Sequence, residues 1–182
     1  MRRESNYDKF PIFTVSRCGS GSWEGWPRIL ERLGAFAAPE QCTISIECYP
    51  GVLEKALIGT LVEGLRPPGL IVTSDLLKSP SEIELMVSGV LGDDPVFGRM
   101  NGLKIEDFFD NAKLAGAREQ VKNWKHGLLV IVGVGASLLS AEPNLLVYAD
   151  MARWEIQQRQ RRNVVGNLGA DNLQEKIGRA HV

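Results

Sequence analysis

The chain has 182 residues, of which 44% are hydrophobic and 24% charged, and its formal net charge is −1 at pH 7. These values are typical of an ordinary globular protein with a sizeable core, and the near-zero charge argues against binding to nucleic acid or to an anionic membrane surface. The longest apolar runs, such as 128–132, are too short to cross a bilayer.

Histidine and cysteine counts limit the chemistry that the chain can support. With only His126 and His181, there is little from which to build a histidine metal site or a Ser-His-Asp triad, so we assign no metal ligand and no catalytic residue. The three cysteines have no metal-like spacing, which indicates reduced thiols in a cytoplasmic protein.

The pattern of apolar residues predicts helices alternating with strands. In chain order, we expect a short helix from about 27 to 33, a strand over 42–48, a helix carrying Leu53, Leu57, Leu61 and Leu65, a strand over 70–73, a helix opened by the capping box Ser79-Pro80-Ser81-Glu82, a helix from a cap at Asp110 to Trp124, strands over 128–132 and 145–149, and a helix over about 150–162.

This order predicts an α/β protein with a mostly parallel sheet and helices on both faces. The later strands are continuous apolar runs, as expected where both faces of a sheet are covered. We predict an irregular segment with a short helix over 1–40, followed by one α/β domain over 41–172.

The last seven residues, 176–182, read KIGRAHV. One reading frame of a common sequencing adapter, AGATCGGAAGAGCACACGTC, encodes IGRAHV after any codon that ends in AG, as a lysine codon can. A natural basic tail is the alternative, but we expect 176–182 to be adapter-derived and the chain to be a fragment of a longer protein. His181 then has no functional role.

The loops that follow the predicted strands hold the candidate binding residues, because ligands of parallel α/β sheets bind at the carboxyl ends of the strands. The candidates are Glu47, Tyr49 and Gly51 after the first strand, Asp75 after the second, and Asp150 and Arg153 after the last. Either aspartate could bind a metal or a sugar hydroxyl, although turns and helix caps are their commoner roles. Asp150 could cap the last helix, beside a solvated Arg153.

The loop around Gly51 lies where a phosphate-binding loop would lie. A P-loop needs GxxxxGK[ST], because its lysine reaches the outer phosphates and its hydroxyl holds magnesium. Here Val52 and Leu53 follow Gly51, so the lysine and the hydroxyl are missing. ATP turnover is therefore not expected, and a simple turn at Pro50-Gly51 is favoured.

A second glycine-rich loop, 133–135, reads GVG. It lacks the third glycine of the dinucleotide fingerprint, whose place is taken by Leu138. Glycines that allow a tight turn are the better explanation.

The last helix is unusually polar. Glu155 and Arg159 have the spacing of an ion pair along one helix face. The helix could offer arginines to a phosphorylated ligand, dock on a domain outside this chain, or be a solvated charged helix, which is the commonest case.

Four segments resemble the N-terminal region of the long bacterial form of class I mannose-6-phosphate isomerase. They are NYDKFP at 6–11, WEGW at 23–26, ECYPGV at 47–52 and LVYADMARWEIQQR at 146–159. The resemblance covers about residues 6–172, and the last segment is the most specific, because packing alone does not demand such a polar helix.

The resemblance implies a two-part enzyme that interconverts mannose 6-phosphate and fructose 6-phosphate. Its catalytic part is a cupin β-barrel with zinc bound by His, Glu and Gln, and no position here matches that set. Zinc is therefore expected in a missing C-terminal catalytic domain, which would be the partner of this chain. The N-terminal region is expected to be a three-layer, P-loop-kinase-like (Rossmann-like) domain with a degenerate phosphate loop.

Two hypotheses follow for the function of this chain. The first is a non-catalytic N-terminal domain of the isomerase, inactive alone. The alternative is a degenerate P-loop module that binds a nucleotide or a sugar phosphate. An active kinase is disfavoured, because the P-loop lysine and hydroxyl are missing.

Overall fold

The computed structural model describes residues 11–12, 21–37, 41–91, 102–170 and 172–173. The expected adapter-derived tail at 176–182 and most of the resembling segment at 6–11 lie outside the described residues. The elements, in chain order, are α1 (Trp26–Phe36), β1 (Gln41–Cys48), α2 (Glu54–Leu65), β2 (Gly69–Val72), the short 3-10 helix η1 (Thr73–Leu76), α3 (Pro80–Leu91), η2 (Ile105–Phe108), α4 (Asn111–Asn123), β3 (Gly127–Gly133), η3 (Ala136–Leu138), β4 (Leu145–Ala149) and α5 (Arg153–Arg161).

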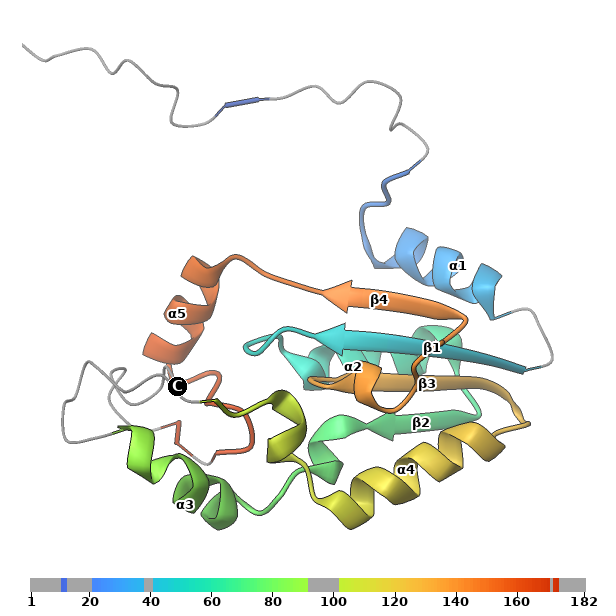
Figure 1. The fold of residues 1–182 in the computed structure, drawn as a ribbon. Helices are drawn as coiled ribbons and strands as arrows, with labels where there is room; N and C mark the ends of the chain where they lie inside the picture. The colour runs from blue at the N-terminus through green and yellow to red at the C-terminus, as the bar shows by residue number, and fades with distance from the viewer. Residues whose placement is uncertain (1–10, 13–20, 38–40, 92–101, 171, 174–182) are drawn as a thin grey trace, which may run out of the picture.

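The four strands form one parallel sheet in the order β2-β3-β1-β4 (Figure 1). Helices cover both faces of the sheet, so the predicted three-layer α/β architecture is confirmed. On one face, Ile44 and Val130 of the sheet pack with Leu61 of α2. On the other face, Ile131 packs with Leu114 of α4.

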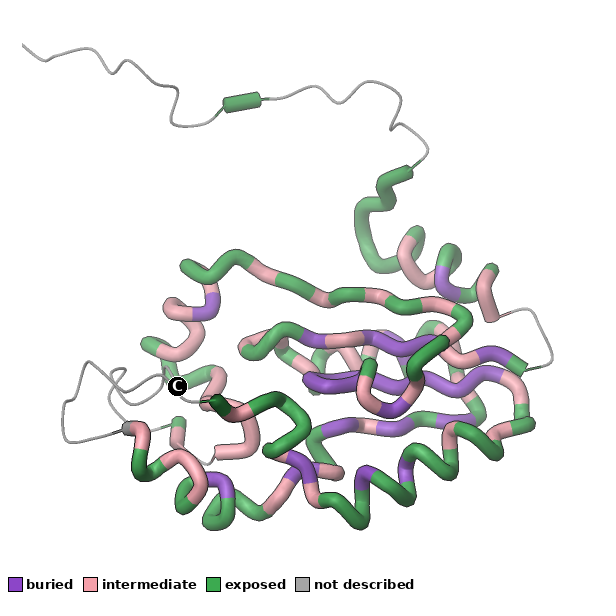
Figure 2. The backbone as a smooth tube through the Cα atoms, viewed as in Figure 1, coloured by how far each residue is buried: buried purple, intermediate pink, exposed green. Residues whose placement is uncertain are grey.

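The central strands are buried because both faces of the sheet are covered. In β3, successive side chains alternate between the two cores, and all residues from Leu128 to Gly133 are buried (Figure 2). This strand is the continuous apolar run that the sequence predicts for a sheet with two covered faces.

Local capping signals set the starts of two helices as predicted. The Asp110 carboxylate accepts the N–H groups of Ala112 and Lys113, both at 2.9 Å, and begins α4. At α3, the N–H of Ser79 donates to Glu82 at 2.9 Å, and the N–H of Glu82 donates back to the Ser79 hydroxyl at 3.4 Å.

Three expectations about element bounds and burial are wrong. Helix α1 runs to Phe36, beyond its expected end at about residue 33. Helix α5 begins at Arg153, and Asp150 does not cap it, because the residue at the N-cap is Ala152 and the Asp150 carboxylate instead accepts the N–H of Met151. Strand β4 is not buried, because it lies at the edge of the sheet.

In the described part of the chain, no helix combines the length and the apolar character needed to cross a membrane.

Candidate functional site

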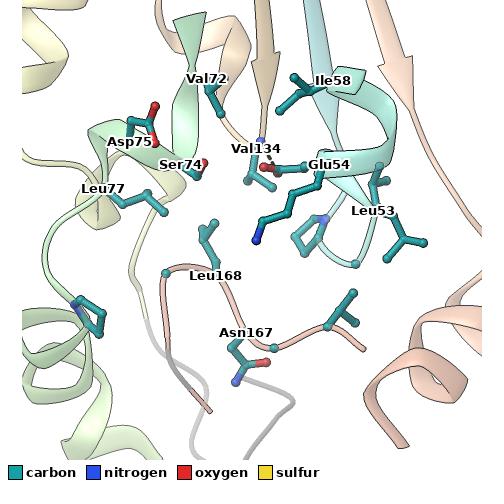
Figure 3. Close-up of a pocket in the computed structure, with 18 of the residues that line it drawn as sticks. Leu53, Glu54, Ile58, Val72, Ser74, Asp75, Leu77, Val134, Asn167 and Leu168 are labelled. Atoms are coloured by element: carbon teal, nitrogen blue, oxygen red, sulfur yellow. Dashed lines mark hydrogen bonds between the residues drawn. The ribbon is translucent and has the colours of Figure 1, made fainter. Parts of the chain in front are cut away.

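A cavity of about 730 Å³ lies at the carboxyl ends of β1, β2 and β3. Its walls come from residues 50–55 in the loop before α2 and its first turn, from the end of β2 and the segment after it within 72–78, from Val134 after β3, and from the segment 164–169 (Figure 3). From β1 the chain crosses to β2 at one edge of the sheet, whereas from β3 it crosses to β4 at the opposite edge. The cavity therefore lies at the topological switch point between the neighbouring strands β1 and β3. The volume falls in the range of small-molecule sites, roughly 300–1,000 Å³.

Four charged side chains line this cavity, and two of them have structural partners. Lys78 Nζ donates to the carbonyl oxygen of Asp107 at 2.5 Å, and Glu54 Oε1 accepts the N–H of Val134 at 3.3 Å. Among the described residues, the side chains of Lys55 and Asp75 have no hydrogen-bond or ion-pair partner. One ammonium and one carboxylate are therefore available to a ligand.

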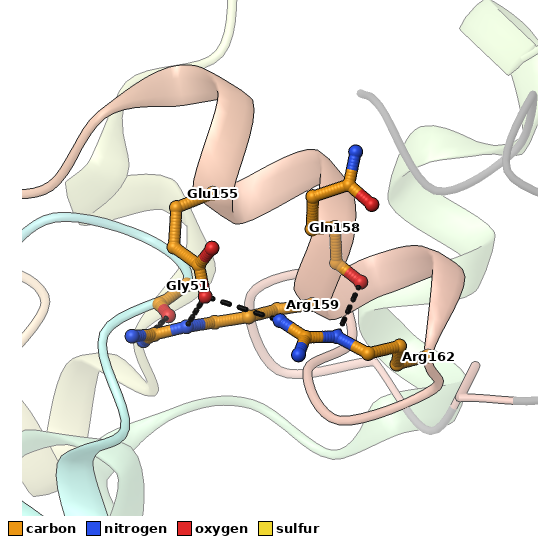
Figure 4. A network of polar contacts seen from close by, with 5 residues as sticks. All are labelled: Gly51, Glu155, Gln158, Arg159 and Arg162. Atoms are coloured by element: carbon orange, nitrogen blue, oxygen red, sulfur yellow. Dashed lines mark hydrogen bonds and ion pairs between the residues drawn. The ribbon is translucent and has the colours of Figure 1, made fainter.

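The loop between β1 and α2 is held in place by α5. Gly51 has φ of 99°, and its carbonyl oxygen accepts a hydrogen bond from Arg159 Nη1 at 2.8 Å (Figure 4). A Cβ at Gly51 would lie 2.9 Å from Cγ2 of Ile156, which is the buried residue of α5. Glycine is thus required here for both its backbone conformation and the close approach of the helix.

The predicted ion pair of α5 is confirmed, with Arg159 Nε 3.1 Å from Glu155 Oε1. Arg162 Nη2 reaches the same oxygen at 3.1 Å and its Nε donates to the Gln158 carbonyl oxygen (Figure 4). A fully solvated helix is therefore the wrong interpretation. One face of α5 packs on its own domain, while Arg153 on another face is exposed.

Backbone N–H groups after β3 are already occupied by carboxylates of the chain itself. Glu47 Oε1 accepts the N–H of Gly135 at 2.6 Å, and Glu47 Oε2 accepts the N–H of Ser137 at 2.8 Å. Successive N–H groups in such a turn can form an anion-binding nest. Here the Glu47 carboxylate takes the place of the anion, so this loop does not present those amides to a phosphate.

The structure brings together two of the six predicted binding residues. Gly51 and Asp75 line the cavity. Glu47 holds the turn after β3, and its carboxylate is engaged there. The other three, Tyr49, Asp150 and Arg153, are exposed and do not line the cavity.

Sequence reasoning missed Lys55, a cavity lysine whose ammonium has no partner in the described part of the chain. The P-loop motif places its lysine directly after glycine, whereas Lys55 follows Gly51 by four residues and stands in the first turn of α2. The sequence feature that points to Lys55 is its position in the first turn of a helix that follows a strand and a loop, because anions bind at such helix N-termini.

The sequence profile of one protein family, described as a domain of unknown function (DUF8485), matches residues 25–181. The chain belongs to this family. The match spans every element from α1 to α5 and all the residues that line the cavity of this DUF8485 domain. No curated protein and no solved structure matches the chain.

Two groups near the cavity of the DUF8485 domain have raised pKa values. Burial, with the Glu54 charge as a second cause, raises the pKa of the Cys48 thiol to about 12, so this thiol stays protonated at neutral pH and is a poor nucleophile. Burial also raises the pKa of the Glu54 carboxyl, the N–H of Val134 opposes the rise, and the charge of Glu47 adds to it.

The raised pKa of Glu54 predicts a pH dependence of stability. The folded state keeps this proton to higher pH than the unfolded state, so stability falls as pH rises from the ordinary carboxyl pKa, about 4.3, through the raised value. Glu54→Gln keeps an oxygen for the N–H of Val134 and removes the titration. Urea midpoints should therefore fall in the parent chain relative to Glu54→Gln as pH rises toward neutrality. The exposed control Glu63→Gln should track the parent chain, and parallel curves for Glu54→Gln and its parent would contradict the assignment.

Proposed function

We propose that this DUF8485 chain is a non-catalytic domain that binds a phosphorylated small molecule in the cavity at the carboxyl ends of its strands. We further propose that it forms the N-terminal part of a cytoplasmic mannose-6-phosphate isomerase. The observation that carries the binding function is Lys55 in the first turn of α2 at the wall of the cavity, whose ammonium has no partner among the residues that the structure describes.

The surroundings of Lys55 favour an anion. The N-terminus of α2 carries partial positive charge, and a lysine in the same turn adds a full charge with three N–H donors. The acidic neighbour Glu54 is directed to the N–H of Val134 on the opposite wall. A phosphate group is the anion best suited to a helix N-terminus beside a lysine.

The cavity wall formed by the residues after β2 favours a sugar over a nucleobase. Ser74 and Asp75 supply a hydroxyl and an uncommitted carboxylate, which can donate to and accept from sugar hydroxyls. Among the described residues that line the cavity there is no aromatic side chain on which a base could stack. A sugar phosphate is therefore preferred to a nucleotide as the ligand.

Thermal unfolding with candidate ligands tests the binding function. Mannose 6-phosphate or fructose 6-phosphate at 100 times its Kd should stabilise the chain by about 2.7 kcal/mol, whereas mannose without phosphate should not. Lys55→Gln should weaken binding about tenfold or more, because a charge-assisted hydrogen bond contributes about 1.5–3 kcal/mol. The exposed control Lys122→Gln should bind as the parent does. If Lys55→Gln bound the sugar phosphate as tightly as the parent chain, the ligand would bind at another site. If the parent chain bound no sugar phosphate, the proposed function would be rejected.

The segment with the most specific resemblance to the isomerase supports the second part of the proposal. Residues 146–159 form most of β4 and the first two turns of α5, and Arg159 at its end holds the Gly51 loop. Arg159 and its ion-pair partner Glu155 therefore support the loop at the wall of the cavity, which gives a reason for these two polar residues beyond packing.

Recovery of the source gene beyond the codon for Lys176 tests the isomerase assignment independently of ligand binding. We expect the frame to continue into a β-rich segment with His, Glu and Gln at zinc-ligand spacing. The resemblance to the isomerase is the reason why zinc is expected in that segment. Isomerase activity is expected in the longer protein and not in this chain. A continuation without such a domain would contradict the assignment.

A further inference from the structure

Strand β4 has an open backbone edge. Among the described strands it pairs only with β1 and stands last in the sheet (Figure 1). The Ala149 carbonyl oxygen accepts the N–H of Tyr49 at 2.9 Å, so the backbone groups of Ala149 point toward β1. Because these groups alternate in direction along a strand, the N–H and C=O groups of Leu146 and Tyr148 point away from the sheet.

The side chains on this edge are apolar and exposed. Leu146 and Tyr148 project on the same face and are 56% and 58% exposed. Open edges in natural proteins are commonly protected by charged residues, proline or bulges. Strand β4, with the sequence LLVYA, has neither a charge nor a proline. Its features are those of an edge that pairs with another strand.

We propose that β4 pairs with β4 of a second copy of this chain, antiparallel about a two-fold axis through Val147. This arrangement joins the two four-stranded sheets into one continuous sheet. It is an isologous interface, in which the same surface patch serves both copies.

The register on this axis satisfies both backbone and side chains. Leu146 lies opposite Tyr148 of the second copy, and the outward groups of these two residues can exchange both hydrogen bonds. Val147, whose backbone groups point toward β1, falls on the axis as the non-hydrogen-bonded pair. The two Leu–Tyr contacts on the exposed face are aliphatic–aromatic pairs of the kind that stabilise sheets. A shift by one residue would lose both matches.

Polar residues beyond the strand fit the same register. Asn144 comes opposite Asp150 of the second copy; its Oδ1 accepts the N–H of Thr43 at 2.8 Å, which leaves its amide N–H groups free to donate to that carboxylate. This complementarity favours a second copy over a different partner.

Disulfide trapping tests the register directly. In a Cys18→Ser background, Leu146→Cys and Tyr148→Cys chains are prepared separately and then mixed in a glutathione redox buffer. Directly opposed residues in a hydrogen-bonded pair have Cα atoms about 5.5 Å apart, which suits a disulfide, whereas diagonal neighbours are about 7–8 Å apart. The mixture should form a covalent heterodimer, at least about tenfold more than either variant alone. Equal or no cross-linking in the mixture would overturn the proposal.

A second measurement covers the case in which a cysteine variant fails to fold. Sedimentation of the parent chain should show a mass that rises with concentration toward twice that of one chain, because a strand pair this short buries less than a standard interface. Leu146→Lys should remain monomeric, and Leu85→Lys, at an exposed leucine of α3, should behave as the parent. A parent chain that stays monomeric, or a Leu146→Lys variant that dimerises, would overturn the proposal.

Discussion

Gly133→Ala should lower the free energy of unfolding by about 2–6 kcal/mol. Gly133 ends β3 with φ of 128°, a conformation that costs an L-residue about 1–3 kcal/mol. A Cβ at this position would clash with Oγ1 of Thr73, which is buried, and overpacking adds about 1–3 kcal/mol. Urea unfolding followed by circular dichroism measures the loss.

Gly59→Ala is the matched control, because it adds the same methyl group in a different setting. Gly59 lies within α2, and a Cβ there meets nothing within 4 Å. This variant should gain about 0.5–1 kcal/mol from its better helix propensity. If Gly133→Ala were as stable as Gly59→Ala, the turn that brings Val134 to the cavity would have to differ from the one described.

Glu47→Ala should lower the free energy of unfolding by about 2–4 kcal/mol. Its carboxylate accepts the N–H groups of Gly135 and Ser137, and its loss leaves the buried N–H of Gly135 without a partner. A lost charge-assisted hydrogen bond costs about 1.5–3 kcal/mol, and less where water can replace it, as at the exposed Ser137. Glu47→Gln, which keeps one acceptor oxygen, should lose less.

The same variant distinguishes a structural role of Glu47 from ligand binding. The exposed control Glu63→Ala should stay within about 0.5 kcal/mol of the parent chain. If Glu47→Ala kept or gained stability while binding sugar phosphate more weakly, Glu47 would be a ligand group, as its position after the first strand suggests. A loss of stability without a change in affinity per folded molecule would support the structural role.

The order of helices and strands was predictable because its signals are local. The cap at Asp110, the capping box from Ser79 to Glu82 and the apolar run of β3 each depend on a few neighbouring residues. The exposure of β4 was not predictable, because it depends on the strand order, which is set by packing between segments far apart in the chain.

The site was predictable only in part, for the same reason. The carboxyl-end rule found Gly51 and Asp75, because every parallel sheet obeys it. The role of Glu47 rests on a contact with Gly135, 88 residues away, and its carboxylate is equally suited to a ligand. The wall formed by residues 164–169 has no periodic pattern that would place it over the strand ends.

The central claim is that the cavity binds a sugar phosphate, and an amide NMR titration with mannose 6-phosphate tests it most directly. We expect saturable shifts in the loop from Gly51 to Lys55 and at Ser74 and Asp75, with no change at Arg153. In Lys55→Gln, saturation should require about tenfold more ligand or higher. Shifts confined to α5, or no saturable shift at any residue, would contradict the account.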